Sequence, residues 1–224
     1  MTVNDTAFLT WSKEWIYLRM LRRLMHVTIV TRAFSVSIPA LPPETDVEAI
    51  DALRLHWRDE SDGAACAQSL AHMLAPPLRA GASILIELRG TLGAGKTTFA
   101  RHLLRALGVQ GRIKSPSYAV VEPHELPGLP MWHFDFYRFT DPREWEDAGF
   151  RDVFGAPGLK LVEWPDKAAG LLPPADLRLD LSTHEHEERS AHWRWGTPQG
   201  HQLILGLARN RACSAPSTLP LEAS

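Results

Sequence analysis

A glycine-rich stretch that ends in Lys-Thr-Thr constrains this chain more than any other feature. Residues 90–98 read Gly-Thr-Leu-Gly-Ala-Gly-Lys-Thr-Thr, which matches the phosphate-binding pattern G-x-x-x-x-G-K-[ST]. Residues 84–89 before it form a short apolar run suited to a buried strand, and residues 99–107 after it repeat apolar side chains at helical spacing. A strand, a glycine-rich turn and a helix in this order let backbone N–H groups and the positive helix end converge on an anion. The sequence therefore predicts a site for a nucleoside triphosphate.

The residues of this loop have separate expected roles. The Lys96 ammonium would reach the terminal phosphates, and the Thr97 hydroxyl would bind Mg²⁺. The chain has no Asn-Lys-x-Asp stretch for guanine recognition, so ATP is favoured over GTP. The residues expected to bind the nucleotide are Gly93, Ala94, Gly95, Lys96, Thr97 and Thr98.

The composition narrows the class of function. Lys and Arg number 24 against 26 Asp and Glu, so the net charge of −2 offers no basic surface for nucleic acid, and any contact with RNA is expected to come through a partner. Cys66 and Cys213 are the two cysteines, which argues against a disulfide framework and fits a reducing cytoplasm. No apolar run approaches the ~20 residues of a membrane span. We expect a cytoplasmic protein without membrane contact.

Three segments are expected along the chain. Residues 1–50 include an arginine-containing, acid-free part from Trp15 to Pro43, and are expected to be an N-terminal extension that is disordered or poorly packed. A targeting segment, or upstream sequence translated from a start codon that is not the true one, are the alternatives. Residues 51–208 are expected to form the P-loop ATPase domain, and residues 209–224, rich in Ser, Pro and Ala, a disordered tail.

The domain is expected to be α/β, with a P-loop NTPase-like mixed sheet, helices on both faces and an antiparallel edge hairpin. The expected strands are 53–57, 84–89, 118–121, 131–136, 159–164, 177–181 and 191–195. The expected helices are 63–74, 99–107 and 141–148. Pro76-Pro77 is expected to stop the first helix. The last two strands alternate apolar and polar residues around a polar turn, which predicts the hairpin at the sheet edge.

Two acids occur where strands are expected to end. Asp135 falls near the end of one apolar run and Glu163 near the end of the next. In open α/β sheets the ligand-binding groups lie at the carboxyl ends of strands, and an acid after Leu-Lys-Leu-Val is hard to bury without a cation or hydrogen-bond donors. We therefore predict Lys96, Asp135 and Glu163 as catalytic residues, and Thr97, Asp135 and Glu163 as Mg²⁺ ligands. The simpler alternative for Asp135 is the cap of the next turn.

Other polar and aromatic residues have open alternatives. Trp164 could stack on adenine or simply pack, and Arg189 could contact phosphate or ribose or lie at a solvated hairpin tip. Ser115-Pro-Ser-Tyr118 could sense the terminal phosphate, as switch segments do, or form an ordinary proline turn. The His184-Glu-His186 stretch matches no specific ligand spacing, so a solvated turn is favoured over a metal site.

Four motifs, in this order, carry a resemblance to a known family: residues 90–98, 115–118, the His-Phe-Asp-Phe-Tyr-Arg stretch 133–138, and Glu163-Trp-Pro165. Together they closely resemble the TsaE (YjeE) family of small bacterial P-loop proteins, which are needed to make threonylcarbamoyladenosine next to the tRNA anticodon. The resemblance covers roughly residues 53–207. It implies an ATP-binding, weakly ATP-hydrolysing protein that acts with the TsaB–TsaD complex and meets tRNA only through that complex.

The resemblance also implies roles for individual residues. Residues from Ala94 to Thr98 would bind phosphates, with Thr97 on Mg²⁺. Asp135 and Glu163 would serve the metal and the attacking water, and Trp164 and Arg189 would lie near the nucleotide. Two other functions stay open: a small-molecule kinase of the P-loop class, and a scaffold that binds nucleotide without hydrolysing it. A kinase generally needs a basic lid, and no Arg-rich segment downstream of the loop supplies one.

Overall fold

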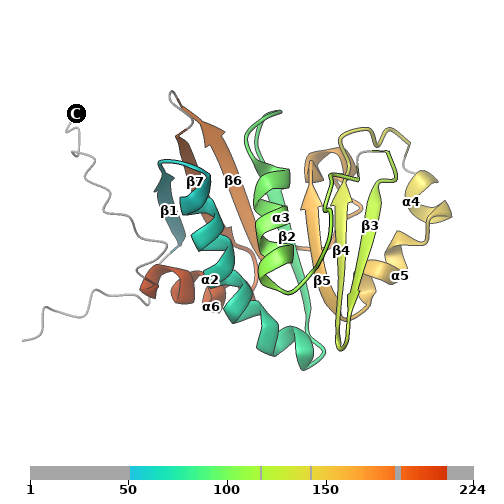
Figure 1. Ribbon diagram of the computed structural model, residues 1–224. Helices are drawn as coiled ribbons and strands as arrows, with labels where there is room; N and C mark the ends of the chain where they lie inside the picture. Colours follow the sequence, from blue (N-terminus) through green and yellow to red (C-terminus); the bar gives the residue numbers. More distant parts are fainter. Residues whose placement is uncertain (1–50, 117, 142, 185–187, 211–224) are drawn as a thin grey trace, which may run out of the picture. The chain divides into compact units, whose positions relative to one another are not determined.

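A mixed β-sheet organises the domain (Figure 1). The computed structural model describes residues 51–116, 118–141, 143–184 and 188–210. The expectation for residues 1–50, that for the tail 209–224 beyond residue 210, and most of the turn expected around His184-Glu-His186 lie outside this described part. Within the described ranges, seven strands follow the order β1-β7-β6-β2-β5-β4-β3. Their bounds are β1 Ala52–Trp57, β2 Ser83–Arg89, β3 Val121–Leu126, β4 Leu129–Asp135, β5 Gly158–Glu163, β6 Leu177–Thr183 and β7 Arg189–Trp195. The four central strands β6, β2, β5 and β4 are parallel, and the outer pairings β1–β7, β7–β6 and β4–β3 are antiparallel.

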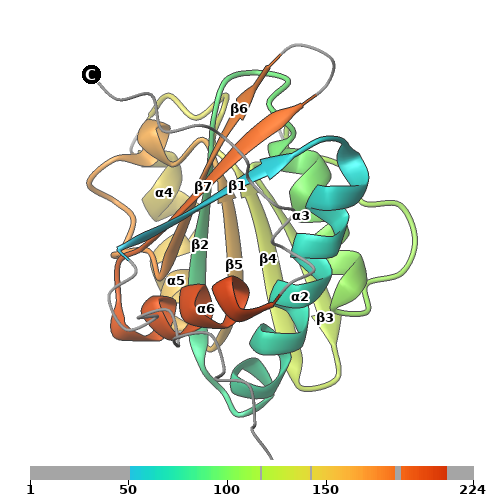
Figure 2. The same cartoon turned by 90° about the vertical axis from the view of Figure 1, so that its left-hand side faces the viewer.

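Helices cover both faces of the sheet, which confirms the expected fold class. Figures 1 and 2 show α2 and α3 on one face and α4 and α5 on the opposite face. Their bounds are α2 Glu60–Arg79, α3 Lys96–Ala106, α4 Arg143–Asp147, α5 Phe150–Gly155 and α6 Pro198–Arg209, with a 3₁₀ helix η2 at Pro165–Ala168. None of the helices in the described ranges is long and apolar enough to cross a membrane.

The two faces of the sheet bury different kinds of side chain. On the α2 and α3 face the core is mainly aliphatic: Ile84, Ile86 and Leu88 of β2 point into it because side chains alternate along a strand. On the other face, Phe134 packs against Phe154 at a ring-centroid distance of 4.8 Å and edge-on against Phe150 at 5.3 Å. Phe134 is next to Asp135 at the carboxyl end of β4. Its aromatic contacts therefore hold the strand end that carries this predicted site residue.

The first helix departs from its expected length. It spans Glu60–Arg79 and runs through Pro76 and Pro77, so the prediction that this pair stops the helix is wrong. Leu78, beyond the prolines, is 1% exposed and anchors the last turn in the core. Neither proline has an N–H to donate, but their carbonyl oxygens accept hydrogen bonds from the backbone N–H groups of Ala80 and Ala82. The end of the helix is therefore still hydrogen-bonded.

Two strand predictions are correct about the presence of strands but wrong about their positions. Residues 118–120 form a turn in which Tyr118 is 85% exposed, and the strand begins at Val121 and runs on to Leu126. Pro123 argues against a strand in the sequence, because proline has no N–H for the sheet hydrogen bonds. β3 tolerates it because β3 is an edge strand. The β6–β7 hairpin is antiparallel as expected, but it does not lie at the sheet edge, because β1 pairs with the outer side of β7.

The region between β4 and β5 holds two short helices where the sequence indicated one. The Asp141 side chain accepts a hydrogen bond from the Arg143 backbone N–H at 2.9 Å and so caps the start of α4. Gly149, directly after the predicted helix 141–148, is the N-cap of α5 at φ +65°. The extra helix α5 contributes Phe150 and Phe154 to the aromatic core.

Candidate nucleotide-binding site

The glycine-rich loop joins β2 to α3 with a backbone that few other sequences could adopt. Gly90 has φ +135°, and a Cβ there would lie 2.3 Å from the carbonyl oxygen of Leu181 in the neighbouring strand β6. Gly95 has φ +100° and is the N-cap of α3, without a side-chain cap hydrogen bond. The first N–H groups of α3 are therefore left for a ligand, at the end of the helix that carries positive partial charge.

Lys96, the first residue of α3, is folded against the loop. Its Nζ donates to the carbonyl oxygens of Gly90 and Thr91, each at 2.8 Å, and lies 3.9 Å from the centre of the Trp164 ring. The residue is 4% exposed. Burial lowers the pKa of the Lys96 ammonium, against the raising effect of the Glu163 and Asp135 charges. The ammonium is thus held at the loop by groups that a phosphate could replace.

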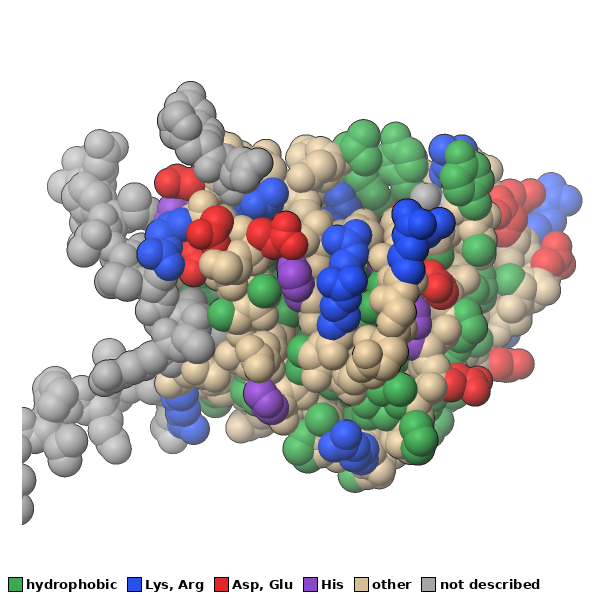
Figure 3. All heavy atoms as spheres, viewed as in Figure 1, with side chains coloured by type: hydrophobic (Ala, Val, Ile, Leu, Met, Phe, Trp, Pro, Cys, Tyr) green, Lys and Arg blue, Asp and Glu red, His purple; other side chains and the backbone are tan. Residues whose placement is uncertain are grey.

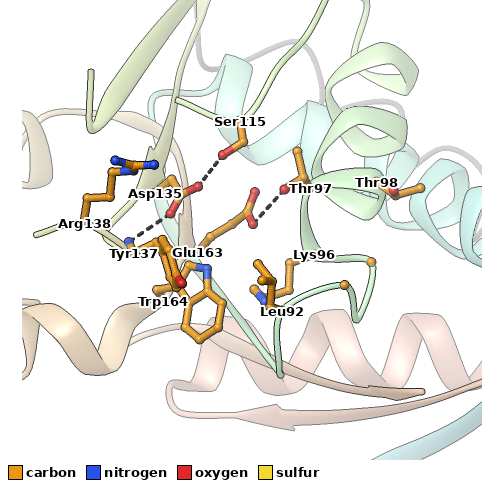
Figure 4. A pocket seen from close by; sticks show the side chains of 12 residues that line it. Leu92, Lys96, Thr97, Thr98, Ser115, Asp135, Tyr137, Arg138, Glu163 and Trp164 are labelled. Atoms are coloured by element: carbon orange, nitrogen blue, oxygen red, sulfur yellow. Dashed lines mark hydrogen bonds between the residues drawn. The ribbon is translucent and has the colours of Figure 1, made fainter. Parts of the chain in front are cut away.

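Two carboxylates lie at the carboxyl ends of adjacent parallel strands. Asp135 on β4 and Glu163 on β5 are direct register partners, so their side chains lie on the same face of the sheet. Thr97 Oγ1 donates to Glu163 Oε2 at 2.9 Å, and Ser115 Oγ donates to Asp135 Oδ2 (Figure 4). The Tyr137 backbone N–H donates to Asp135 Oδ1 at 3.0 Å, so this acid also performs the turn-capping role considered for it from the sequence.

His133 is a further residue of the site to which the sequence reasoning gave no role. It lies two residues before Asp135 on β4 and is fully buried. Its Nε2 is 2.9 Å from Glu163 Oε1, on the opposite side of that carboxylate from Thr97. One feature of the sequence could have indicated that His133 belongs to the site: side chains alternate along a strand, which places residues 133 and 135 on the same face of β4.

Lys96, Asp135 and Glu163 line one cavity of about 390 Å³. Of the predicted nucleotide-binding and catalytic residues, the structure brings eight together in its lining: Gly93, Gly95, Lys96, Thr97, Thr98, Asp135, Glu163 and Trp164. Four further lining residues are outside the predicted nucleotide-binding and catalytic set: Leu92, Ser115, Tyr137 and Arg138. Of these, Ser115 belongs to the candidate switch segment 115–118. Ala94, within the loop, is fully buried and does not line the cavity.

Arg189 and Trp164 take different positions around the loop. Arg189, at the start of β7, does not line the cavity; its Nε is 3.1 Å from where a Cβ on Gly95 would lie. Trp164 follows β5 in a left-handed conformation with φ +57°, between Lys96 and Tyr137. Its ring centroid is 5.0 Å from that of Tyr137. Trp164 is therefore beside the lysine expected to hold the terminal phosphates.

The donor set fits a magnesium ion that arrives with a nucleotide. In the described part of the chain, no group of three or more His, Cys, Asp and Glu side chains is arranged to hold a metal ion. The cavity instead offers two carboxylates and the Thr97 hydroxyl, all oxygen donors. Mg²⁺ is usually bound through one or two carboxylates together with phosphate oxygens and water. The residues present are thus suited to Mg²⁺ shared with a polyphosphate.

A phosphate loop between a buried strand and a helix, with a lysine and two acids around one cavity, defines a P-loop nucleotide-binding protein of the α/β class. The family model described as "Threonylcarbamoyl adenosine biosynthesis protein TsaE" matches residues 57–191. The chain belongs to the TsaE family.

Curated relatives agree with this assignment. The chain is 43% identical over 103 residues to the tRNA threonylcarbamoyladenosine biosynthesis protein TsaE of Haemophilus influenzae, covering 46% of this chain and 65% of that protein. It is 34% identical over 105 residues to the protein of the same name from Bacillus subtilis, covering 47% and 65%. With the Rickettsia typhi protein of that name it shares 30% identity over 106 residues, covering 47% and 73%. The match thus spans slightly less than two thirds of the first two relatives.

A solved structure supports the fold. The crystal structure of Bacillus subtilis YdiB superposes with a TM-score of 0.58 at 24% sequence identity, covering 70% of this chain and 95% of that one. At this identity the likeness establishes the arrangement of strands and helices.

Proposed function

We propose that this protein binds ATP with Mg²⁺, hydrolyses it slowly, and acts in threonylcarbamoyladenosine biosynthesis with TsaB and TsaD in the cytoplasm. One observation carries the catalytic part of the proposal: Lys96, Asp135 and Glu163, from three separate elements, line a single cavity beside the phosphate loop. The names of the TsaE relatives support the pathway. The TsaB and TsaD partners come from the family resemblance of the sequence motifs.

Each group would contribute to phosphoryl transfer in a different way. Backbone N–H groups at the start of α3 and the Lys96 ammonium would bind the phosphates and stabilise their developing charge. Thr97, Asp135 and Glu163 would hold Mg²⁺, which supplies charge neutralisation at the phosphate oxygens when bound. A carboxylate would orient the attacking water. Glu163 is the better candidate, because its Oε2 would be freed when Thr97 turns to Mg²⁺, whereas Asp135 would stay bonded to Ser115 and to the Tyr137 backbone.

The segment around Ser115 is suited to report the state of the nucleotide. Ser115 donates to Asp135 inside the cavity, while Tyr118, three residues on, is 85% exposed and stacks with the Arg138 guanidinium at 4.4 Å. A change at the Ser115–Asp135 bond would therefore reach an exposed surface over a short distance. ATP can drive a partner only if the two nucleotide states differ in their affinity for it.

We propose that tRNA is met through the partners rather than directly. On the face that carries α2 and α3, positive and negative side chains are interspersed (Figure 3), in keeping with the net charge of −2. Direct binding of an RNA backbone depends on a concentration of Lys and Arg side chains on one surface.

ATP turnover of the purified protein tests the proposal. We expect slow hydrolysis that increases when TsaB and TsaD are added, and that is lost in Lys96→Ala and weakened in Glu163→Ala. Stimulation by a small-molecule acceptor, with formation of a phosphorylated product, would instead identify a kinase. ATP binding without turnover, even with the partners present, would identify a scaffold. Unchanged hydrolysis in both variants would contradict the assignment of the site.

A further inference from the structure

His133 occupies a place in the sheet where a hydrocarbon side chain would be expected. It is fully buried on β4, on the face that also buries Met131 of the same strand and Leu161, its register partner on β5. Histidine is rarely chosen to fill such a position, because its polar ring atoms lose water on burial and need partners. The residue therefore calls for a reason other than packing.

The hydrogen bonds of the ring indicate what that reason is. Nε2 is 2.9 Å from Glu163 Oε1, whereas Nδ1 is buried without a hydrogen-bond partner among the described residues. A carboxylate only accepts hydrogen bonds, so Nε2 must carry the hydrogen. The ring thus leaves one nitrogen unpaired, at a cost in folding free energy, and uses the other on Glu163.

Glu163 is thereby held from two sides. Thr97 Oγ1 donates to one carboxylate oxygen and His133 Nε2 to the other, both at 2.9 Å, and the residue is 2% exposed. Thr97 is the hydroxyl expected to turn to Mg²⁺ when nucleotide binds, which would leave His133 as the remaining fixed contact of the Glu163 side chain.

We propose that His133 is a positioning residue, which holds the Glu163 carboxylate in the orientation needed for Mg²⁺ and for the attacking water. The proposal rests on the proposed ATPase function of the same site. Partners in the layer behind a metal ligand commonly fix its orientation, and their loss typically costs ~10–100-fold in metal affinity or activity.

Two amide substitutions separate positioning from packing. In His133→Gln, the amide nitrogen is as many bonds from Cα as Nε2 of histidine, so it can still donate to Glu163; in His133→Asn it is one bond shorter and falls short. His192→Gln is the matched control, since His192 is a half-buried histidine on β7 whose charged neighbours Arg54, Arg194 and Asp180 do not line the cavity. The full-length variants are compared by ATP hydrolysis with TsaB and TsaD, and by fluorescent ADP binding during a MgCl₂ titration.

We expect His133→Asn to lower kcat and to raise the Mg²⁺ concentration for half-maximal effect on ADP binding, each by ~10-fold or more. KM and the Mg²⁺-free affinity for ADP should stay within ~3-fold, and His133→Gln and His192→Gln should resemble the wild type. The proposal is overturned if Asn and Gln at 133 are impaired equally, or if Asn behaves as the wild type does. Absence of hydrolysis in the wild-type complex would instead reject the ATPase function, while the Mg²⁺ titration would still test His133.

Discussion

Two buried lysines, Lys96 and Lys160, have similar immediate contacts and lie in different parts of the fold. Lys96 donates to two loop carbonyls and lies 3.9 Å from the Trp164 ring centre. Lys160 on β5 donates to Ser83 Oγ at 2.9 Å and to the Ala156 carbonyl, and lies 5.3 Å from the ring centre of Trp132. Burial lowers the pKa of both, for Lys160 to about 8.

The two lysines differ in whether the nearest acids are free to contact a ligand. Lys96 lines the same cavity as Asp135 and Glu163, which can turn to a ligand. The acid whose charge acts on Lys160 is Asp176, and its carboxylate is already engaged by the Leu85 backbone N–H at 2.8 Å and by Thr197. Burial and a lowered pKa alone therefore do not identify a functional lysine; acids that line the same open cavity do.

The largest expected difference is in nucleotide affinity. Lys96→Met should weaken ATP binding by about 100-fold, or about 2.8 kcal/mol, because the ammonium contact with the phosphates is lost. Lys160→Met should leave the affinity within ~2-fold, since its ammonium bonds to Ser83 and Ala156, which do not line the cavity. Isothermal titration calorimetry with ATP and MgCl₂ measures both. An equal loss in the two variants would remove the distinction drawn between the lysines.

A smaller difference is expected in the pH dependence of stability. Below about pH 8, Lys160 is protonated in both the folded and unfolded states. Between about pH 8 and its ordinary pKa of 10.5, the folded protein loses this proton first, so the contribution of Lys160 to stability rises with pH in that window. Between pH 7.5 and 9.5, urea unfolding should show a rise in stability that is larger by roughly 1–2 kcal/mol in the wild type than in Lys160→Met, since Lys96 contributes in both proteins. The same rise in both proteins would contradict the assignment.

The smallest expected effect is a change in tryptophan fluorescence, which should distinguish Trp164 from Trp132. Displacement of the Lys96 ammonium toward a phosphate would change the surroundings of Trp164, which lines the cavity, but not those of Trp132. We expect ATP to change the tryptophan fluorescence of the wild type and of Trp132→Phe, and the change to be absent in Trp164→Phe. A signal that survives in Trp164→Phe would mean that Lys96 stays against the ring.

Much of the fold could be predicted because its signals are local. The apolar runs predicted β2, β4 and β5 within one or two residues, and the alternation in residues 177–195 predicted the β6–β7 hairpin. The errors occurred where tertiary contacts outweigh local preference. Burial of Leu78 carries α2 past two prolines, and the edge position of β3 accommodates Pro123.

The candidate site likewise has residues that the sequence could predict and contacts that it could not. Lys96 and Thr97 belong to a contiguous pattern, and Asp135 and Glu163 could be inferred from their place at strand ends. The contact between His133 and Glu163 could not be inferred, because it depends on the register between β4 and β5. Nor could the sequence place Arg189 beside Gly95 and outside the cavity, since β7 joins the sheet between β6 and β1.

By itself the sequence determined the phosphate loop, its flanking strand and helix, and the family to which these motifs point. A contiguous motif needs only the backbone preferences of its own residues, such as the positive φ of Gly95 ahead of α3. Which acids face the loop, which histidine holds one of them and which lysine stays structural were decided by strand order and register. Those are set by the packing of many residues distant in the chain, and no short stretch encodes them.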